Sequence, residues 1–144
     1  MSLVFLVGVD CSSCGSRALE YAADRASVKG ARLIVAHVIE WSQFSFSTPQ
    51  ENEERHKRRE EEIQRAHAEI LDPIIADLSE QGVVVEGVVK HGHVANTLLA
   101  IARDFKATNI MVGRQGSSRL KAQLFGSVAS TLVQIADRPV TVVP

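Results

Sequence analysis

The chain has 144 residues, of which 45% are hydrophobic and 23% charged, and its formal net charge at pH 7 is -1. A chain of this length and composition fits one folded domain that needs neither disulfides nor a structural metal for stability. The near-neutral charge argues against nucleic acid as a main partner, because general nucleic-acid binders carry a basic surface.

The first apolar run, residues 3–9, predicts a buried strand that Asp10 ends. This run is too short to span a membrane, and no basic residues precede it as they would in a signal peptide. We therefore expect a cytoplasmic protein with no membrane insertion. The only two cysteines, Cys11 and Cys14, are expected to stay reduced there unless they work in redox chemistry.

Four more apolar runs are similarly short, rich in Val, Leu and Ile, and continuous rather than alternating. Such runs are typical of strands that helices cover on both faces of a parallel sheet. The five predicted strands span 3–9, 32–39, 83–89, 109–113 and 139–143. Helical spacing of apolar residues predicts helices over 14–28 and 94–105 and a last helix after Gly126. The alternation favours right-handed crossovers and a doubly wound α/β sheet in a single domain, residues 1–144.

The region between the second and third strands begins with a loop, residues 40–50, and continues as a long helix, residues 51–81. The first half of this helix is highly charged, which predicts a solvated surface, whereas an apolar stripe from Ile63 onward predicts burial of the second half. Pro73 either kinks the helix or starts a second one capped by Asp72. The loop contains aromatic residues that either pack on the sheet edge or form a lid or partner patch: Trp41, Phe44 and Phe46.

Three glycines mark corners where a ligand could approach the backbone. Gly113 ends the fourth strand, Gly116 follows it, and Gly126 precedes the last helix. Glycine lets successive N–H groups form an anion-binding nest, and the first amides of the last helix, Ser127 to Ala129, add the positive end of a helix dipole. Both features suit phosphate groups. Taken alone, the same glycines fit simple turns equally well.

The spacing G-x2-G-x9-G-S and the motifs around it resemble the universal stress protein family over most of the chain. The resemblance rests on an aspartate and a serine after the first strand, a His-Val pair near the end of the second, and a Gly-Ser start to the last helix. The similar segments are FLVGVDCSSCGSRAL at 5–19, LIVAHVIE at 33–40, VKHGHVANTLLAIA at 89–102 and VGRQGSSRLKAQLFGSVASTLVQIADRPVTVV at 112–143.

The resemblance implies a flavodoxin-like fold of the adenine nucleotide alpha hydrolase type, with a five-stranded parallel sheet in the order 3-2-1-4-5 and helices on both faces. It also implies a homodimer and, in the branch that keeps the glycine signature, binding of ATP with Mg²⁺. Topology indicates the same place independently, because ligands of open α/β sheets bind at the carboxyl ends of the strands where the order reverses. Here that crevice lies between Asp10, after the first strand, and Gly113, at the end of the fourth.

The family's nucleotide contacts transfer onto matching positions of this chain. Those to the base and ribose fall on Gly8, Val9, Asp10, the backbone of Val38, Val112 and Gly113. Those to the phosphates fall on Gly116, Gly126, Ser127, Val128 and Ala129, the last of which lacks the hydroxyl found in some relatives. The carboxylate of Asp10 can accept from the adenine amino group or a ribose hydroxyl, hold Mg²⁺ through water, or cap the following helix.

The loop after Gly113 departs from the family pattern. Arg114 stands where the family usually has a small hydroxyl residue, and Gln115 stands where a basic residue is common. We count Arg114 among the nucleotide contacts. Arg119 and Lys121 keep positive charge in the loop for the phosphates.

Two alternative functions remain open. Cys11 and Cys14 form a C-x-x-C motif at the start of a helix, the arrangement in which thioredoxin-like proteins present a reactive thiolate. A thiol redox sensor or oxidoreductase would use these two residues, but it gives the three glycines no role. The second alternative is a non-enzymatic dimeric adaptor with a vestigial pocket.

The histidines suggest structural roles. His37, near the end of an apolar strand, is expected to be packed and hydrogen-bonded. His91 and His93 lie two residues apart, but the sequence places no acid or thiol beside them, so we predict no metal site.

These observations favour an ATP-binding, nucleotide-dependent regulator of the stress response. We expect slow ATP hydrolysis or none, because no general base is placed near the expected γ-phosphate and no Walker-type lysine is present. A homodimer is expected to form through residues 139–143, an apolar last strand that would otherwise leave a sheet edge open. The sequence does not identify the protein partner that such a regulator would need.

Overall fold

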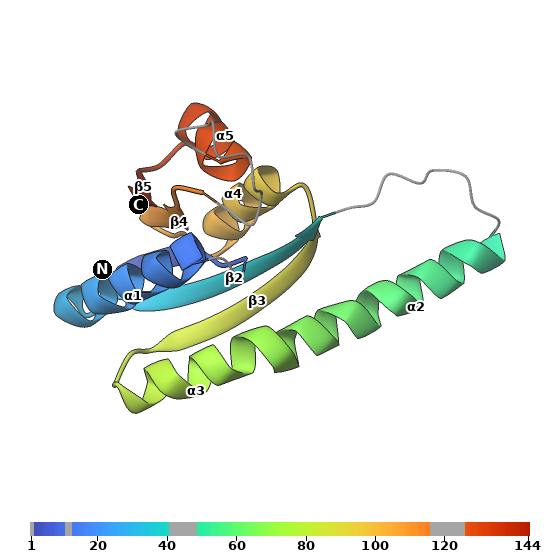
Figure 1. The fold of residues 1–144 in the computed structure, drawn as a ribbon, viewed down its shortest axis with the longest axis horizontal. Helices are drawn as coiled ribbons and strands as arrows, with labels where there is room; N and C mark the ends of the chain where they lie inside the picture. The colour runs from blue at the N-terminus through green and yellow to red at the C-terminus, as the bar shows by residue number, and fades with distance from the viewer. Residues whose placement is uncertain (1, 11–12, 41–48, 116–125) are drawn as a thin grey trace.

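The computed structural model describes residues 2–10, 13–40, 49–115 and 126–144 (Figure 1). Its five strands are parallel and lie in the predicted order, β3-β2-β1-β4-β5. The strands are β1 (Val4–Gly8), β2 (Arg32–Glu40), β3 (Val85–Gly92), β4 (Asn109–Gly113) and β5 (Val140–Val143). Each strand corresponds to one of the predicted apolar runs.

Helices cover both faces of the sheet. On one face lie α1 (Ser13–Lys29) and a long helical segment made of α2 (Pro49–Ala66), the π-helical turn η1 (His67–Leu71) and α3 (Asp72–Glu80). On the other face lie α4 (Val94–Asp104) and α5 (Ser127–Ile135). Figure 1 shows the long segment running beside β3, with the N-terminal half of α2 extending away from the rest of the fold.

Both faces of the central strands are buried. In β1, Val4 and Leu6 belong to the core beneath α4 and α5, whereas Phe5 and Val7 belong to the core beneath α1 and α3. The division follows from the pleat, which turns successive side chains to opposite faces. Two-sided burial explains why these strands read as continuous apolar runs in the sequence.

The third strand lies further along the chain than predicted. Val83 is buried but precedes the strand, and its N–H donates to the carbonyl of Leu78 at the end of α3. At the other end the strand continues through Lys90 to Gly92, which pairs with Glu40 of β2. The apolar run ends at Val89, but the backbone ladder does not depend on side-chain polarity and extends three residues more.

The helix passes Pro73 without leaving helical geometry. In the π-helical turn before it, the N–H of Asp72 donates to the carbonyl of His67, five residues back. A wide turn of this kind relieves the clash that a proline ring makes with the carbonyl four residues before it, here that of Glu69.

Of the two alternatives for Pro73, a second helix capped by Asp72 was wrong. The N-cap of α3 is Leu71, whose backbone is helical and which makes no side-chain cap hydrogen bond, whereas a capping residue needs an extended backbone. The carboxylate of Asp72 instead lies 2.9 Å from Nδ1 of His67.

The charged helix is solvated, as predicted. None of the described side chains of α2 is fully buried, and its inward contacts come from Ile63 and Ala66 near the end of the helix. The apolar stripe continues into η1 and α3, where Leu71 and Leu78 are buried against the sheet. None of the helices in the described ranges combines the length and apolar character needed to cross a bilayer.

Candidate functional site

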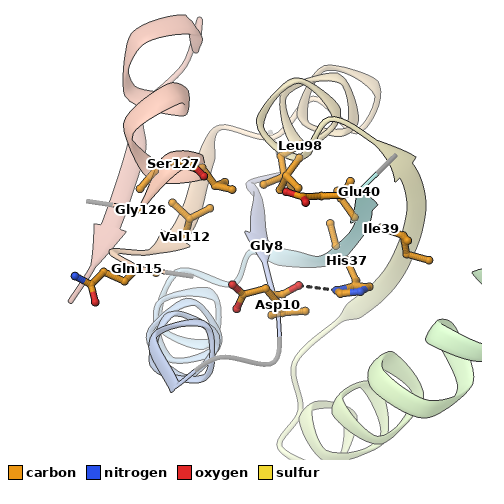
Figure 2. A pocket seen from close by; sticks show the side chains of 17 residues that line it. Gly8, Asp10, His37, Ile39, Glu40, Leu98, Val112, Gln115, Gly126 and Ser127 are labelled. Atoms are coloured by element: carbon orange, nitrogen blue, oxygen red, sulfur yellow. Dashed lines mark hydrogen bonds between the residues drawn. The ribbon is translucent and has the colours of Figure 1, made fainter. Parts of the chain in front are cut away.

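A cavity of about 510 Å³ opens at the carboxyl ends of the strands, between β1 and β4 (Figure 2). The chain leaves β1 toward β2 on one side, and it returns through α4 to β4 on the other, so the strand order reverses here. This is the crevice that the topology predicted. The lining residues are Gly8, Val9, Asp10, Ala36, His37, Val38, Ile39, Glu40, Val94, Leu98, Val112, Gly113, Gln115, Gly126, Ser127, Val128 and Ala129.

One end of the cavity is an apolar slot. Its walls are formed by Ala36 and Val38 from β2 and by Val94 and Leu98 from the first turns of α4. Gly8 at the end of β1 keeps the slot open, because a Cβ there would lie only 3.0 Å from Cδ1 of Leu98. A narrow apolar space of this kind fits a flat ring such as a nucleobase.

In the cavity lining, His37 holds the backbone that follows β1. Nδ1 of His37 lies 2.8 Å from the carbonyl oxygen of Val9, and because a carbonyl only accepts, Nδ1 carries the proton. The N–H of Val9 donates to the carbonyl of Ala36, so the chain just after β1 stays attached to β2. The next residue, Asp10, lines the cavity beside these groups (Figure 2). His37 is half-buried and hydrogen-bonded, as predicted.

The N-terminus of α5 forms the other end of the cavity. Its N-cap, Gly126, is extended (φ -67, ψ 164) and provides no side-chain cap. The carbonyl of Gly126 accepts from Ser130, and the helix itself supplies no acceptor for the amides of Ser127, Val128 and Ala129. These residues line the cavity, so the positive end of the helix dipole faces it.

Backbone hydrogen bonds hold the two ends of the segment between β4 and α5, at Arg114 and Gly126. The carbonyl of Arg114 accepts from the N–H of Gly126, at 2.7 Å, and the N–H of Arg114 donates to the carbonyl of Val143 at the end of β5, also at 2.7 Å. Arg114 itself is exposed and is not among the residues that line the cavity. The amide of Gly126 is therefore occupied, and an anion here would meet the amides after it.

The cavity gathers most of the predicted nucleotide contacts: Gly8, Val9, Asp10, Val38, Val112, Gly113, Gly126, Ser127, Val128 and Ala129. Gly116, Cys11, Arg119, Lys121 and the aromatic residues of the 40–50 loop lie outside the described residues. Cys14 is the second residue of α1. Apart from Val38, the prediction missed the groups that β2 and α4 supply, above all Glu40, Val94 and Leu98. The crevice rule, applied to the carboxyl end of β2 as well as β1, would have indicated Glu40.

The described part of the lining is acidic. Asp10 and Glu40 are its carboxylates, His37 is its one imidazole, and no Lys or Arg belongs to it. Attraction for an anion therefore comes, within these residues, from the helix amides rather than from cationic side chains.

The two remaining candidate histidines lie apart from the cavity lining. His91 on β3 is held against α2, with Nε2 3.5 Å from Oε2 of Glu62, and burial lowers the pKa of His91 below its usual value while Glu62 opposes the shift. His93 is the N-cap of α4, directly before the helix predicted from residue 94. Within the described ranges, no three His, Cys, Asp or Glu side chains come together as a metal site.

Solved structures of universal stress proteins share this fold. UspA from Lactobacillus plantarum superposes with a TM-score of 0.83 at 20% identity, covering 99% of this chain and 97% of that one. A universal stress protein in complex with cAMP gives a TM-score of 0.63 at 22% identity, with coverages of 99% and 96%. The universal stress protein from Archaeoglobus fulgidus in complex with dAMP gives 0.61 at 16% identity, with coverages of 100% and 98%.

Sequence comparison finds relatives of the same kind. A universal stress protein of Mycobacterium bovis is 30% identical over 159 residues, covering 99% of this chain and 48% of that protein, so this chain spans about half the length of that relative. YxiE, a universal stress protein of Bacillus subtilis, is 28% identical over 96% of both chains. The family model for universal stress proteins matches residues 1–144. Because the family model matches the chain from residue 1 to residue 144, this chain belongs to the universal stress protein family.

Proposed function

We propose that the cavity binds an adenine nucleotide, ATP with Mg²⁺, and that the protein acts as a nucleotide-dependent regulator of the stress response. The main support is the uncapped N-terminus of α5 facing a cavity whose opposite end is an apolar slot. A nucleotide has the matching polarity, since its base is flat and largely apolar and its phosphates are anionic. The cAMP and dAMP complexes of two family members are consistent with this ligand class.

The nucleotide would lie across the carboxyl ends of the strands. Its base would enter between Val38 and Leu98, its ribose would lie near Asp10 and Val112, and its phosphates would reach the first amides of α5. Helix amides bind phosphate without a cationic side chain, because several N–H groups and the helix dipole act together.

Mg²⁺ would enter with the phosphates. It prefers oxygen ligands and is usually held by one or two carboxylates together with phosphate oxygens and water. Asp10 provides a carboxylate on the cavity wall, and Ser127 and Gln115 provide neutral oxygens near the α5 end. This donor set suits a nucleotide-bound Mg²⁺ better than a transition metal.

The chemistry of the lining favours binding over turnover. At the α5 end, the described polar side chains are Gln115 and Ser127, and neither is a general base at neutral pH. Occupancy can instead act on the fold, because the hydrogen bonds Gly126 to Arg114 and Arg114 to Val143 connect the phosphate end of the cavity to the outer strand β5. A protein partner would then bind differently to the β5 edge when the cavity holds a nucleotide and when it does not.

The direct test is nucleotide content and affinity. Protein purified without added nucleotide and then denatured should release an adenine nucleotide, and the stripped protein should bind ATP with Mg²⁺ in a calorimetric titration. A stripped protein that gives no heat with ATP, and whose thermal stability does not change at saturating ATP, would overturn the proposal, because a ligand of the native state must stabilise it.

Replacing Ser127 with proline should weaken ATP binding about tenfold. Proline removes the first amide of α5, yet it is well tolerated at the first position of a helix, and Gly126 already has the extended backbone that a residue before proline needs. Ser127→Ala is the matched control, since it removes the hydroxyl and keeps the amide. Calorimetry should give the proline variant a Kd well above that of the alanine variant, and equal values would mean that the helix amides do not hold the phosphates.

We also propose a homodimer in which β5 of one protomer meets a second copy. In the β4–β5 ladder the carbonyls of Pro139 and Val143 face β4, so in a parallel ladder the amides of Val140 and Val142 face outward. The strand is half-buried along its whole length, and Val133 and Ile135 of the adjacent α5 are exposed. An outer edge of this kind favours pairing.

Replacing Val142 with proline should yield a monomer in sedimentation velocity at micromolar concentration. Proline removes an outward amide and is tolerated in an edge strand. Val142→Ala loses similar packing but keeps the amide, so it should remain dimeric. A wild-type monomer, or a proline variant that sediments like wild type, would contradict pairing through β5.

A further inference from the structure

Glu40 stands out among the groups that line the cavity. It is the last residue of β2, and Figure 2 shows its carboxyl group beside Leu98, turned toward the middle of the cavity and opposite Ser127. Ionised carboxylates only accept hydrogen bonds. None of the hydrogen bonds and ion pairs between described residues involves Glu40.

A carboxylate at this position opposes the binding of an anion. It repels phosphates in the same cavity, and no Lys or Arg of the described lining neutralises it. A hydrogen-bond donor that the ligand brings to Glu40 would offset this repulsion directly at the carboxylate. Because Glu40 lies at the apolar slot and away from α5 (Figure 2), the donor must belong to the base end of the nucleotide.

We propose that Glu40 determines base specificity by accepting a hydrogen bond from the exocyclic amino group of the base, so that the cavity selects adenine over hypoxanthine. This inference rests on the proposed nucleotide site. Adenine presents an amino donor at its sixth position, whereas hypoxanthine presents a carbonyl oxygen there and carries its donor on the neighbouring N1. A carboxylate positioned for the amino group therefore faces an oxygen, with no hydrogen between them. The two nucleotides share ribose and phosphates, so their affinity ratio reports the base contact alone.

A structural role for Glu40 makes a different prediction. Glu40 pairs with Gly92 of β3, just before α4 begins at Val94, and a carboxylate near a helix N-terminus can stabilise the fold. If that were its only role, replacing Glu40 would lower thermal stability and weaken ATP and ITP equally. The ratio of the two affinities therefore separates recognition of the base from support of the helix.

The experiment compares ATP and ITP, each with Mg²⁺, in calorimetric titrations of four proteins. Wild type should prefer ATP by at least about tenfold, the size of one hydrogen bond to a charged group. Glu40→Ala should bind ATP more weakly and ITP more tightly, which brings the ratio close to one. Glu40→Gln should also bind ITP better than wild type, because an amide can turn its NH₂ toward the base oxygen. Glu80→Gln, at the exposed end of α3, is the matched control and should keep the wild-type ratio.

The outcomes separate this inference from the proposed function. If wild type binds ATP and ITP equally, or if Glu40→Ala keeps the wild-type ratio, Glu40 does not read the base, although the nucleotide site stands. If wild type binds neither nucleotide, the proposed function itself fails and the inference fails with it.

Discussion

Replacing Gly8 with valine should weaken ATP binding at least about 100-fold while the chain stays folded. Gly8 ends β1 in the middle of the cavity (Figure 2). A Cβ there would lie 3.0 Å from Cδ1 of Leu98 and 3.5 Å from Cγ1 of Val112, so the methyl groups of valine would project into the cavity beside Leu98, which is part of the slot wall. A factor of 100 corresponds to about 2.7 kcal/mol, which is within the range for forcing extra carbon atoms into a packed space.

The fold should tolerate this change. Gly8 pairs with Ala36 in the β1–β2 ladder, and valine is well suited to an extended backbone. Circular dichroism and urea unfolding of Gly8→Val should show a folded chain, and ATP titration should show the loss. Gly8→Ala provides the graded comparison, since its single methyl group requires only a small shift of Leu98 and should cost about tenfold. Wild-type affinity in the folded valine variant would place the base outside this slot.

The sheet could be predicted from the sequence because its central strands are buried on both faces. Runs such as Leu33 to Ala36, all fully buried, therefore indicate a central parallel strand rather than any other element. The limits of β3 were less predictable. Its last residues, including His91, are held by pairing with β2 rather than by their own hydrophobicity, and that information lies in another part of the chain.

The cavity could be predicted only in part, for a similar reason. Gly8, Gly113 and Ser127 follow or precede predicted elements, so the crevice rule and the glycine spacing bring them together. Leu98 reaches the cavity because α4 packs on the face of the sheet that carries Ala36 and Val38, which is a tertiary relation with no local signal. The structure places these residues around one space, and the nucleotide they bind stays a prediction.

Replacing Arg138 with methionine should lower the free energy of unfolding by about 2–3 kcal/mol. Nη1 of Arg138 donates to two backbone carbonyls, that of Ala102 at 3.1 Å and that of Ala107 at 2.8 Å. These bonds attach the turn between α5 and β5 to the last turn of α4 and to the turn that follows it. Hydrogen bonds to a charged group contribute about 1.5–3 kcal/mol each. The carbonyl of Ala102 also accepts from the N–H of Ala107, so it keeps one partner in the variant, and the expected loss comes mainly from the carbonyl of Ala107.

Asp137 holds the guanidinium in place for these bonds. Its Oδ1 accepts from Nε of Arg138 at 2.9 Å, and its Oδ2 accepts from Nε of Arg103 at 3.2 Å. The hydrogen bond from Arg138, with that from Arg103, lowers the pKa of Asp137 to about 2. Asp137 is therefore ionised throughout the neutral range. Its ion pair with Arg138 keeps the guanidinium group turned toward the carbonyls of Ala102 and Ala107.

Arg103→Met is the matched control, because Arg103 contacts the same carboxylate from a much more exposed position. The side chain of Arg103 is 56% exposed and that of Arg138 only 20%. Exposed ion pairs typically contribute about 0–1 kcal/mol, so urea unfolding at pH 7 should give the Arg103 variant nearly wild-type stability. Equal losses in the two variants would mean that the ion pair with Asp137 matters and the two carbonyl bonds do not. A larger loss in Arg138→Met would show that this side chain stabilises the fold by joining the turn before β5 to the end of α4.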